Sequence, residues 1–359
     1  MTRYSTDKTT GVPAAGKDAN GKCMADIAAY RLLRVLAVWA VVLLHALYVS
    51  YNLFQTQLSG AVIEWAALLT NELLWAVPCF LMVTGALLLT PEKPLTCRKV
   101  YTRYLPRILG ALVVWTPLFA LFDVVASGTP MNGERIVEAF RHIIVGDGWT
   151  HLWYLYLLIG LYLLMPFFQR ALIASSRREL YVLTGILVVF LSIVPFLQST
   201  GFVIGFTIPV TTIFPLYLLL GYGLRTGRFR RLGIPLFLAG TAASGFIFIY
   251  MMRTGLETKG SWFWSYASLF IIVQAVGLFL TVQRLFRNHR SGRILRLLDE
   301  TSFGVYLLHM VFIRLLFHHW RINLLNRPLL FALAVIGIYL LSFILTAVGR
   351  RVPLLRKIL

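Results

Sequence analysis

Charged residues are scarce in this sequence, and acidic residues are the scarcest of them. Asp, Glu, Lys and Arg make up 13% of the 359 residues, with only 14 acidic residues against 34 basic ones. A soluble domain typically carries about 25% charged residues, so the composition excludes an ordinary soluble protein. The chain is instead 58% hydrophobic, with a mean hydropathy of +0.77. These values predict an all-α protein that crosses a membrane many times.

Cysteine is equally rare, and its three positions follow no recognisable spacing. Cys23, Cys79 and Cys97 form neither a disulfide framework nor a metal-ligand pattern, so we expect no bound metal. The first residues are polar and lack the apolar core of a signal peptide. We interpret 1–27 as a disordered cytoplasmic tail, 28–350 as a transmembrane domain and 351–359 as a basic cytoplasmic tail.

The net charge of +20 has a simple explanation in a membrane protein. Cytoplasmic loops collect Lys and Arg, and most basic residues here fall in alternate loops, which places both termini in the cytoplasm. We therefore expect membrane lipid, and no nucleic acid, as a partner. The basic clusters are the segment through Arg34, then 93–107, 170–178, 225–231, 284–296 and 350–357. The loops between them contain few basic residues, Lys259 among them.

The apolar segments predict a bundle of about ten transmembrane helices. Pro78, Pro117 and Pro215 predict kinks within three of them. In the largest outer loop, 127–150, apolar residues recur at helical spacing, which predicts an amphipathic helix. That helix either lies on the outer membrane interface or packs as an ordinary surface helix. The predicted spans are 31–51, 62–89, 104–126, 151–169, 180–198, 207–224, 232–252, 262–283, 302–318 and 328–348.

The first span carries two residues that hydrocarbon disfavours, Arg34 and His45. They are 11 residues apart, which is ~20° past three helical turns, so both side chains share one face and we expect them to face a common cavity. Arg34 alone could extend to cytoplasmic phosphates, and His45 alone could form an interhelical hydrogen bond. Together they suit a reaction: imidazole accepts a proton or attacks an acyl carbon, and guanidinium holds an anion.

Other polar residues extend this candidate site. Arg98, Arg103 and Arg107 either anchor the first cytoplasmic loop or form a phosphate clamp beside Arg34. A histidine base usually has a carboxylate partner that orients it. The two candidates for His45 are Glu72 and Asp123, and Glu72 is the better one.

Two later spans add aromatic and histidine side chains. His151 and Trp153 open the fourth span, where aromatic residues belong to a membrane-interface belt or stack on a sugar. Tyr306 and His309 share a face of the ninth span, where His309 either packs structurally or lines the cavity of His45.

These segments together resemble the acyltransferase-3 family of integral membrane acyltransferases, from about Ala28 to Arg350. The resemblance rests on five motifs in order: an arginine and histidine 11 residues apart (Arg34, His45), PCFLMVTG with Thr84 and Gly85, the pair Arg103 and Arg107, HLWYLYLLIGLYLLMPFF, and SFGVYLLH. Two departures are a threonine, Thr84, where serine is commoner, and the apolar Trp75, Ala76 and Val77 where many members have an acidic residue.

The resemblance implies a stand-alone enzyme of the bacterial cytoplasmic (inner) membrane. It would transfer an acetyl or other short acyl group from cytoplasmic acetyl-CoA, or another acyl-CoA, to a hydroxyl of a cell-surface glycan or its lipid-linked precursor. His45 would be catalytic with Arg34, and Arg98, Arg103, Arg107 and Thr84 would bind the donor. We expect the acceptor near His151, Trp153, Tyr306, His309 and Glu72.

Two other classes of protein remain compatible with the sequence. One is a transporter or flippase of a lipid-linked saccharide, and the other is a non-catalytic component of a polysaccharide export complex. In either case His45 and Arg34 would gate or relay protons instead of transferring an acyl group.

Overall fold

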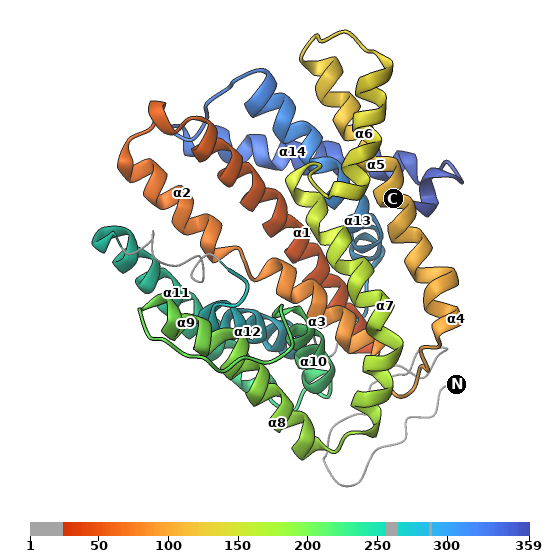
Figure 1. Ribbon diagram of the computed structural model, residues 1–359, viewed down its shortest axis with the longest axis vertical. Coiled ribbons are helices and arrows are strands. Elements are labelled where there is room, and N and C mark those ends of the chain that lie inside the picture. The colour runs from red at the N-terminus through yellow and green to blue at the C-terminus, as the bar shows by residue number, and fades with distance from the viewer. Residues whose placement is uncertain (1–23, 256–264, 287–288) are drawn as a thin grey trace.

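The computed structural model describes residues 24–255, 265–286 and 289–359. Within these ranges every regular element is a helix, which confirms the predicted all-α bundle (Figure 1). Most of the predicted tail 1–27, including Cys23, and the loop residue Lys259 lie outside the described residues. The main helices are α1 (Met24–Leu53), α2 (Gly60–Glu72), α3 (Ala76–Leu88), α4 (Cys97–Lys99), α5 (Leu105–Ala126), α6 (Gly133–Val145), α7 (Trp153–Ala174), α8 (Arg177–Val188), α9 (Val194–Ser199), α10 (Phe214–Leu224), α11 (Gly233–Thr254), α12 (Leu269–Leu285), α13 (Arg293–Ile313) and α14 (Pro328–Gly349).

Eight helical segments of the described chain are long and apolar enough to cross a membrane. Two more apolar helices, α10 and α12, are shorter. All ten predicted spans therefore correspond to an apolar helix or helix pair. The eight long segments are Ile27–Leu53, Gly60–Leu88, Cys97–Ala126, Gly133–Ala174, Arg177–Ser199, Arg230–Thr254, Arg293–His319 and Pro328–Gly349.

The predicted proline kinks are partly wrong. Pro215 stands in the first turn of α10, so it begins that helix instead of bending it. The second span breaks between α2 and α3, at 73–75, which leaves Pro78 in the first turn of α3. Proline is common in the first turn of a helix because the N–H groups of that turn have no hydrogen-bond partner within the helix, so the missing N–H of proline costs nothing there. Of these three prolines, only Pro117 lies inside a continuous helix, α5.

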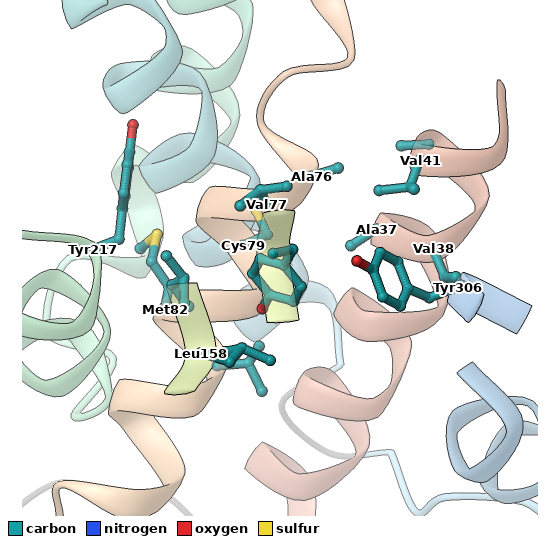
Figure 2. Packing of buried hydrophobic residues seen from close by; sticks show 14 of the residues in the cluster. Ala37, Val38, Val41, Ala76, Val77, Cys79, Met82, Leu158, Tyr217 and Tyr306 are labelled. Atoms are coloured by element: carbon teal, nitrogen blue, oxygen red, sulfur yellow. The ribbon is translucent and has the colours of Figure 1, made fainter. Parts of the chain in front are cut away.

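Helix α1 lies at the centre of the bundle, in contact with α2, α3, α12, α13 and α14. Its buried face carries small side chains, which allow neighbouring membrane helices to approach closely. Figure 2 shows Ala37 and Val41 of α1 on the side toward the region of α3 that holds Ala76 and Val77. The Tyr306 ring of α13 lies beside α1 in the same view. The centre of the bundle therefore brings the first and ninth predicted spans together.

The predicted amphipathic helix in the largest loop is present as α6. The Asn132 side chain caps its start by accepting a hydrogen bond from the backbone N–H of Arg135 at 2.9 Å. The helix ends at Gly146, whose φ of 76° is one that glycine adopts without strain. Phe140 and Ile144 on its apolar side are exposed.

The segment after α14, predicted as a basic tail, folds back onto α5. Leu355–Lys357 form a single 3₁₀ turn, and Leu359 is buried. The backbone carbonyl of Leu359 accepts a hydrogen bond from Arg107 Nη2 at 2.9 Å.

Candidate active site

Three histidines from three separate segments meet inside the bundle. His45 Nδ1 on α1 lies 3.0 Å from His309 Nε2 on α13, and the His151 ring centroid lies 5.4 Å from that of His309. His151 belongs to the 3₁₀ turn Thr150–Leu152, which precedes α7. His151 and His309 are buried and His45 is half-buried. His151, expected at the membrane interface, thus lies in the interior beside the first-span histidine.

The hydrogen bonds of His309 determine the tautomer of His45. His309 Nδ1 lies 3.2 Å from the carbonyl of Val305, which can only accept, so the proton is on Nδ1 and Nε2 of a neutral His309 is an acceptor. The contact from Nε2 to His45 Nδ1 is then a hydrogen bond that His45 donates. The remaining nitrogen, His45 Nε2, keeps its lone pair and is the atom that can accept a proton.

His151 supplies a second imidazole acceptor. Its Nε2 lies 3.2 Å from the carbonyl of Leu307 and therefore donates to it. Its Nδ1 is buried and has no hydrogen-bond partner among the described residues. The hydroxyl of Tyr306 donates to the backbone carbonyl of His151, which fixes the turn against α13. A buried acceptor without a partner is unfavourable, so this nitrogen is suited to a polar ligand.

His45 and His151 face a cavity of about 30 Å³. Room for one water needs about 10–15 Å³, so this space matches two waters or a group as small as acetyl. The predicted residues Trp153 and Tyr306 also line it. The remaining lining is apolar or aromatic, and includes Val77, Phe80 and Tyr154.

A second and larger cavity, of about 400 Å³, lies between the N-terminal half of α1, at Arg34, and that of α13, at Asp299. Arg34, Thr84 and Arg107 line it as predicted donor-binding residues, together with Arg350. Arg98 and Arg103, also predicted to bind the donor, are exposed and do not line this cavity. Arginines from three predicted cytoplasmic segments therefore converge on one cavity.

Arg34 forms a two-pronged ion pair with Asp299 of α13. Its Nε and Nη2 lie 2.6 and 2.7 Å from the two carboxylate oxygens, and the Asp299 side chain is only 8% exposed. Sequence reasoning missed Asp299 because it placed the start of the ninth span at 302, whereas α13 begins at Arg293. The available signal was the acidic pair Asp299 and Glu300, directly before an apolar run.

Three aromatic rings separate the two cavities. Phe80, Tyr154 and Tyr306 line both, and the Tyr154 centroid lies 6.2 Å from Phe80 and 5.7 Å from Tyr306. The expectation that Arg34 and His45 face one cavity is therefore wrong. The two side chains, about 16 Å apart along α1, open into adjacent cavities with a wall of rings between them.

Glu72 does not orient His45. Its carboxylate accepts a hydrogen bond from Gln274 Nε2 at 2.9 Å, because the break after α2 directs this helix end toward α11 and α12. In the described part of the chain no carboxylate contacts His45, whose Nδ1 partner is His309. The same ranges contain no group of three His, Cys, Asp or Glu side chains arranged to hold a metal ion.

Fold and site together define a class of protein: a multi-span membrane bundle that buries an imidazole base next to a cavity lined with arginines. Comparison with known families identifies the family to which the chain belongs. The model of the Acyl_transf_3 family, described as an acyltransferase domain, matches residues 27–347, nearly the whole chain. The protein belongs to this family and is a membrane acyltransferase. A search of curated proteins and a search of solved structures each returned no match.

Proposed function

We propose that the protein transfers an acetyl or other short acyl group from cytoplasmic acyl-CoA to a hydroxyl of a cell-surface glycan or its lipid-linked precursor. The unprotonated Nε2 of His45 carries this proposal, because it faces a small cavity that adjoins the arginine-lined one. In this proposal the protein lies in the bacterial inner membrane with both termini in the cytoplasm, on the side of the acyl-CoA pool.

The cavity of about 400 Å³ is the proposed donor site. Arg107 and Arg350 bring positive charge to it, and phosphate groups of CoA are anions that arginine holds with paired donors. Arg34 is partly neutralised by Asp299, so its main role there is to fix α1 against α13. The acyl arm of the donor would pass between the rings of Phe80, Tyr154 and Tyr306 to reach His45.

The reaction follows from the tautomer of His45. Nε2 removes the proton from the acceptor hydroxyl, the oxygen attacks the thioester carbonyl carbon, and the carbon–sulfur bond breaks. The imidazolium then returns its proton to the departing thiolate, so the products are an ester and free CoA. Attack by Nε2 itself, through an acyl-imidazole, uses the same atom and predicts a burst of free CoA without acceptor.

The size of the His45 cavity favours acetyl over longer acyl groups. With the rings in place, its volume of about 30 Å³ suits a short acyl group better than a chain of several methylenes. Discrimination against each additional methylene in such a space is typically 10- to 200-fold.

The deciding experiment is His45→Ala, with His289→Ala, an exposed histidine, as its matched control. We expect His45→Ala to lose acyl transfer by roughly 10²–10⁴-fold, as removal of a general base does, while the variant still inserts. Mass spectrometry of surface glycans should then show intact glycan without the acyl group. If the glycan itself disappears and the purified protein neither binds nor hydrolyses acyl-CoA, the protein is a transporter and the proposal fails.

A further inference from the structure

A third cavity, of about 470 Å³, lies at the opposite end of α13 from the donor cavity. Asp299 lines the donor cavity and Arg314 lines this one, and their separation of 15 positions corresponds to about 22 Å of helix. Its volume falls within the range of small-molecule sites, about 300–1,000 Å³. We call it the distal cavity.

The distal cavity is basic. Arg135, Arg314, His318 and His319 line it, against a single carboxylate, Asp123. That carboxylate is already satisfied: Arg314 donates two hydrogen bonds to it at 2.9 and 2.8 Å, and Trp149 Nε1 donates a third at 2.7 Å.

The remaining cationic groups are available to a ligand. Within the described chain the Arg135 side chain forms no ion pair, and neither His318 nor His319 forms a side-chain hydrogen bond. Three of the four basic residues, Arg314, His318 and His319, belong to the π-helical segment Arg314–His319 at the end of α13. Such widened turns are frequent at functional sites.

Trp149 connects the distal cavity to the histidine cluster. The Arg314 guanidinium lies 4.8 Å from the centroid of the Trp149 ring, and that centroid lies 6.1 Å from the His151 ring. The Trp149 ring therefore lies between His151 and Arg314, which lines the distal cavity, so a molecule whose charged end occupied that cavity would extend past this ring to approach His151. The unpartnered Nδ1 of His151 would be available to its hydroxyl.

We infer that the distal cavity binds an anionic group of the acceptor, a phosphate or a carboxylate, and so presents an acceptor hydroxyl to His151 and His45. This inference rests on the proposed function and narrows it: the acceptor is an acidic saccharide or a saccharide phosphate, not a neutral sugar. Two sources share this chemistry, the phosphates of a lipid-linked saccharide and the carboxylates of an acidic glycan.

The test measures binding to purified full-length protein in nanodiscs of neutral phosphatidylcholine. The probes are pyrophosphate, glucose 1-phosphate, glucuronate and glucose. Isothermal titration calorimetry measures the binding of each. We expect saturable binding of the anions and none of glucose. Preference for the phosphates identifies a phosphorylated acceptor, and preference for glucuronate identifies a carboxylated one. Either preference supports the inference.

Arg135→Gln should weaken anion binding about tenfold, the effect of losing a hydrogen bond to a charged group, and Arg135→Lys should restore part of it. The matched control is Arg141→Gln, on the same helix and paired with Glu138 outside the cavity, which should bind as the wild type does. Equal losses in the two glutamine variants would overturn the inference.

Two further outcomes also overturn it. One is displacement of every anion by phosphatidylglycerol in the nanodisc, which would make the cavity a site for bilayer headgroups. The other is wild-type protein that binds acyl-CoA but none of the anions, a result that leaves the proposed function intact. Protein that binds the anions but never acyl-CoA would contradict the proposed function and leave the anion site of the distal cavity intact.

Discussion

His309 connects α13 to His45, the proposed general base of the first helix. Its Nε2 accepts a hydrogen bond from His45 Nδ1. Its own Nδ1–H donates to the backbone carbonyl of Val305, four residues earlier in the helix. An orienting partner of this kind is usually a carboxylate, and here a neutral ring serves. Because no charge accompanies it, the cluster avoids burying an unpaired anion in the membrane.

We predict that His309→Phe lowers kcat by roughly 10²-fold while the KM for acyl-CoA stays unchanged. Phenylalanine keeps the ring volume but cannot accept a hydrogen bond from His45 Nδ1. His45 then also populates the tautomer that carries its proton on Nε2. His309→Gln, which can accept through its side-chain oxygen, should recover part of the rate. Steady-state kinetics of the two variants in one detergent check this. Equal rates for both would show that His309 only fills space.

At the scale of single residues, the sequence predicted which candidate residues share a helix face better than which residues of distant helices they contact. The 11-residue spacing of Arg34 and His45 correctly placed them on one helix face. The contact between His45 and His309 joins residues 264 positions apart, and no local pattern encodes it. For the same reason the sequence could not show that Glu72 packs against Gln274 instead of His45.

Helices α1 and α13 are held in register by the ion pair of Arg34 with Asp299. We predict that Asp299→Leu destabilises the protein by about 1–3 kcal/mol, because it leaves a half-buried guanidinium unpaired; solvent access to Arg34 keeps the loss below that of a fully buried pair. The double variant Arg34→Leu with Asp299→Leu should recover part of this stability, because Arg31, which also pairs with Asp299 at 3.4 Å, still loses its partner. Thermal unfolding followed by tryptophan fluorescence measures both.

Donor affinity separates the two roles of Arg34 in that experiment. If Arg34 also contacts the donor, the stable double variant has a raised KM for acyl-CoA. An unchanged KM would show that the residue acts only by joining the helices.

The crossing of α3 and α10 depends on two glycines that face each other's helix. A Cβ at Gly221 would collide with the backbone of Met82, and one at Gly85 with the backbone of Leu218. We predict that Gly221→Ala lowers the folded yield, since overpacking of a tight interface costs about 1–3 kcal/mol. Gly223→Ala, on the same helix with no atom near its added methyl, is the control. Size-exclusion profiles of both variants decide the matter.

Most helices were predictable from apolar length alone, but helix ends were not. Both the break at 73–75 and the start of α10 at Phe214 depend on neighbours, since a run of apolar residues specifies no boundary. The early start of α13 had the largest consequence, because it brought Asp299 into the bundle.

The two ends of α13 give the whole molecule a donor side and a distal side. We predict that a cysteine at Thr102 and one at Ser127, both exposed and at opposite ends of α5, react from opposite sides of the membrane. In a background with the native cysteines replaced by serine, an impermeant maleimide should label Ser127→Cys in intact cells. Thr102→Cys should react only after permeabilisation. The reverse pattern would invert the orientation that the basic loops predict.

The wall formed by Phe80, Tyr154 and Tyr306 has a consequence for the cell as well as for the reaction. An aqueous path joining the donor cavity to the distal one would let protons flow down the electrochemical gradient that powers the cell. Packed rings are an electrical insulator, and they need part only as far as a thioester arm requires. Under the proposed function, the enzyme would therefore move an acyl group from one side of the membrane to the other without dissipating the proton gradient.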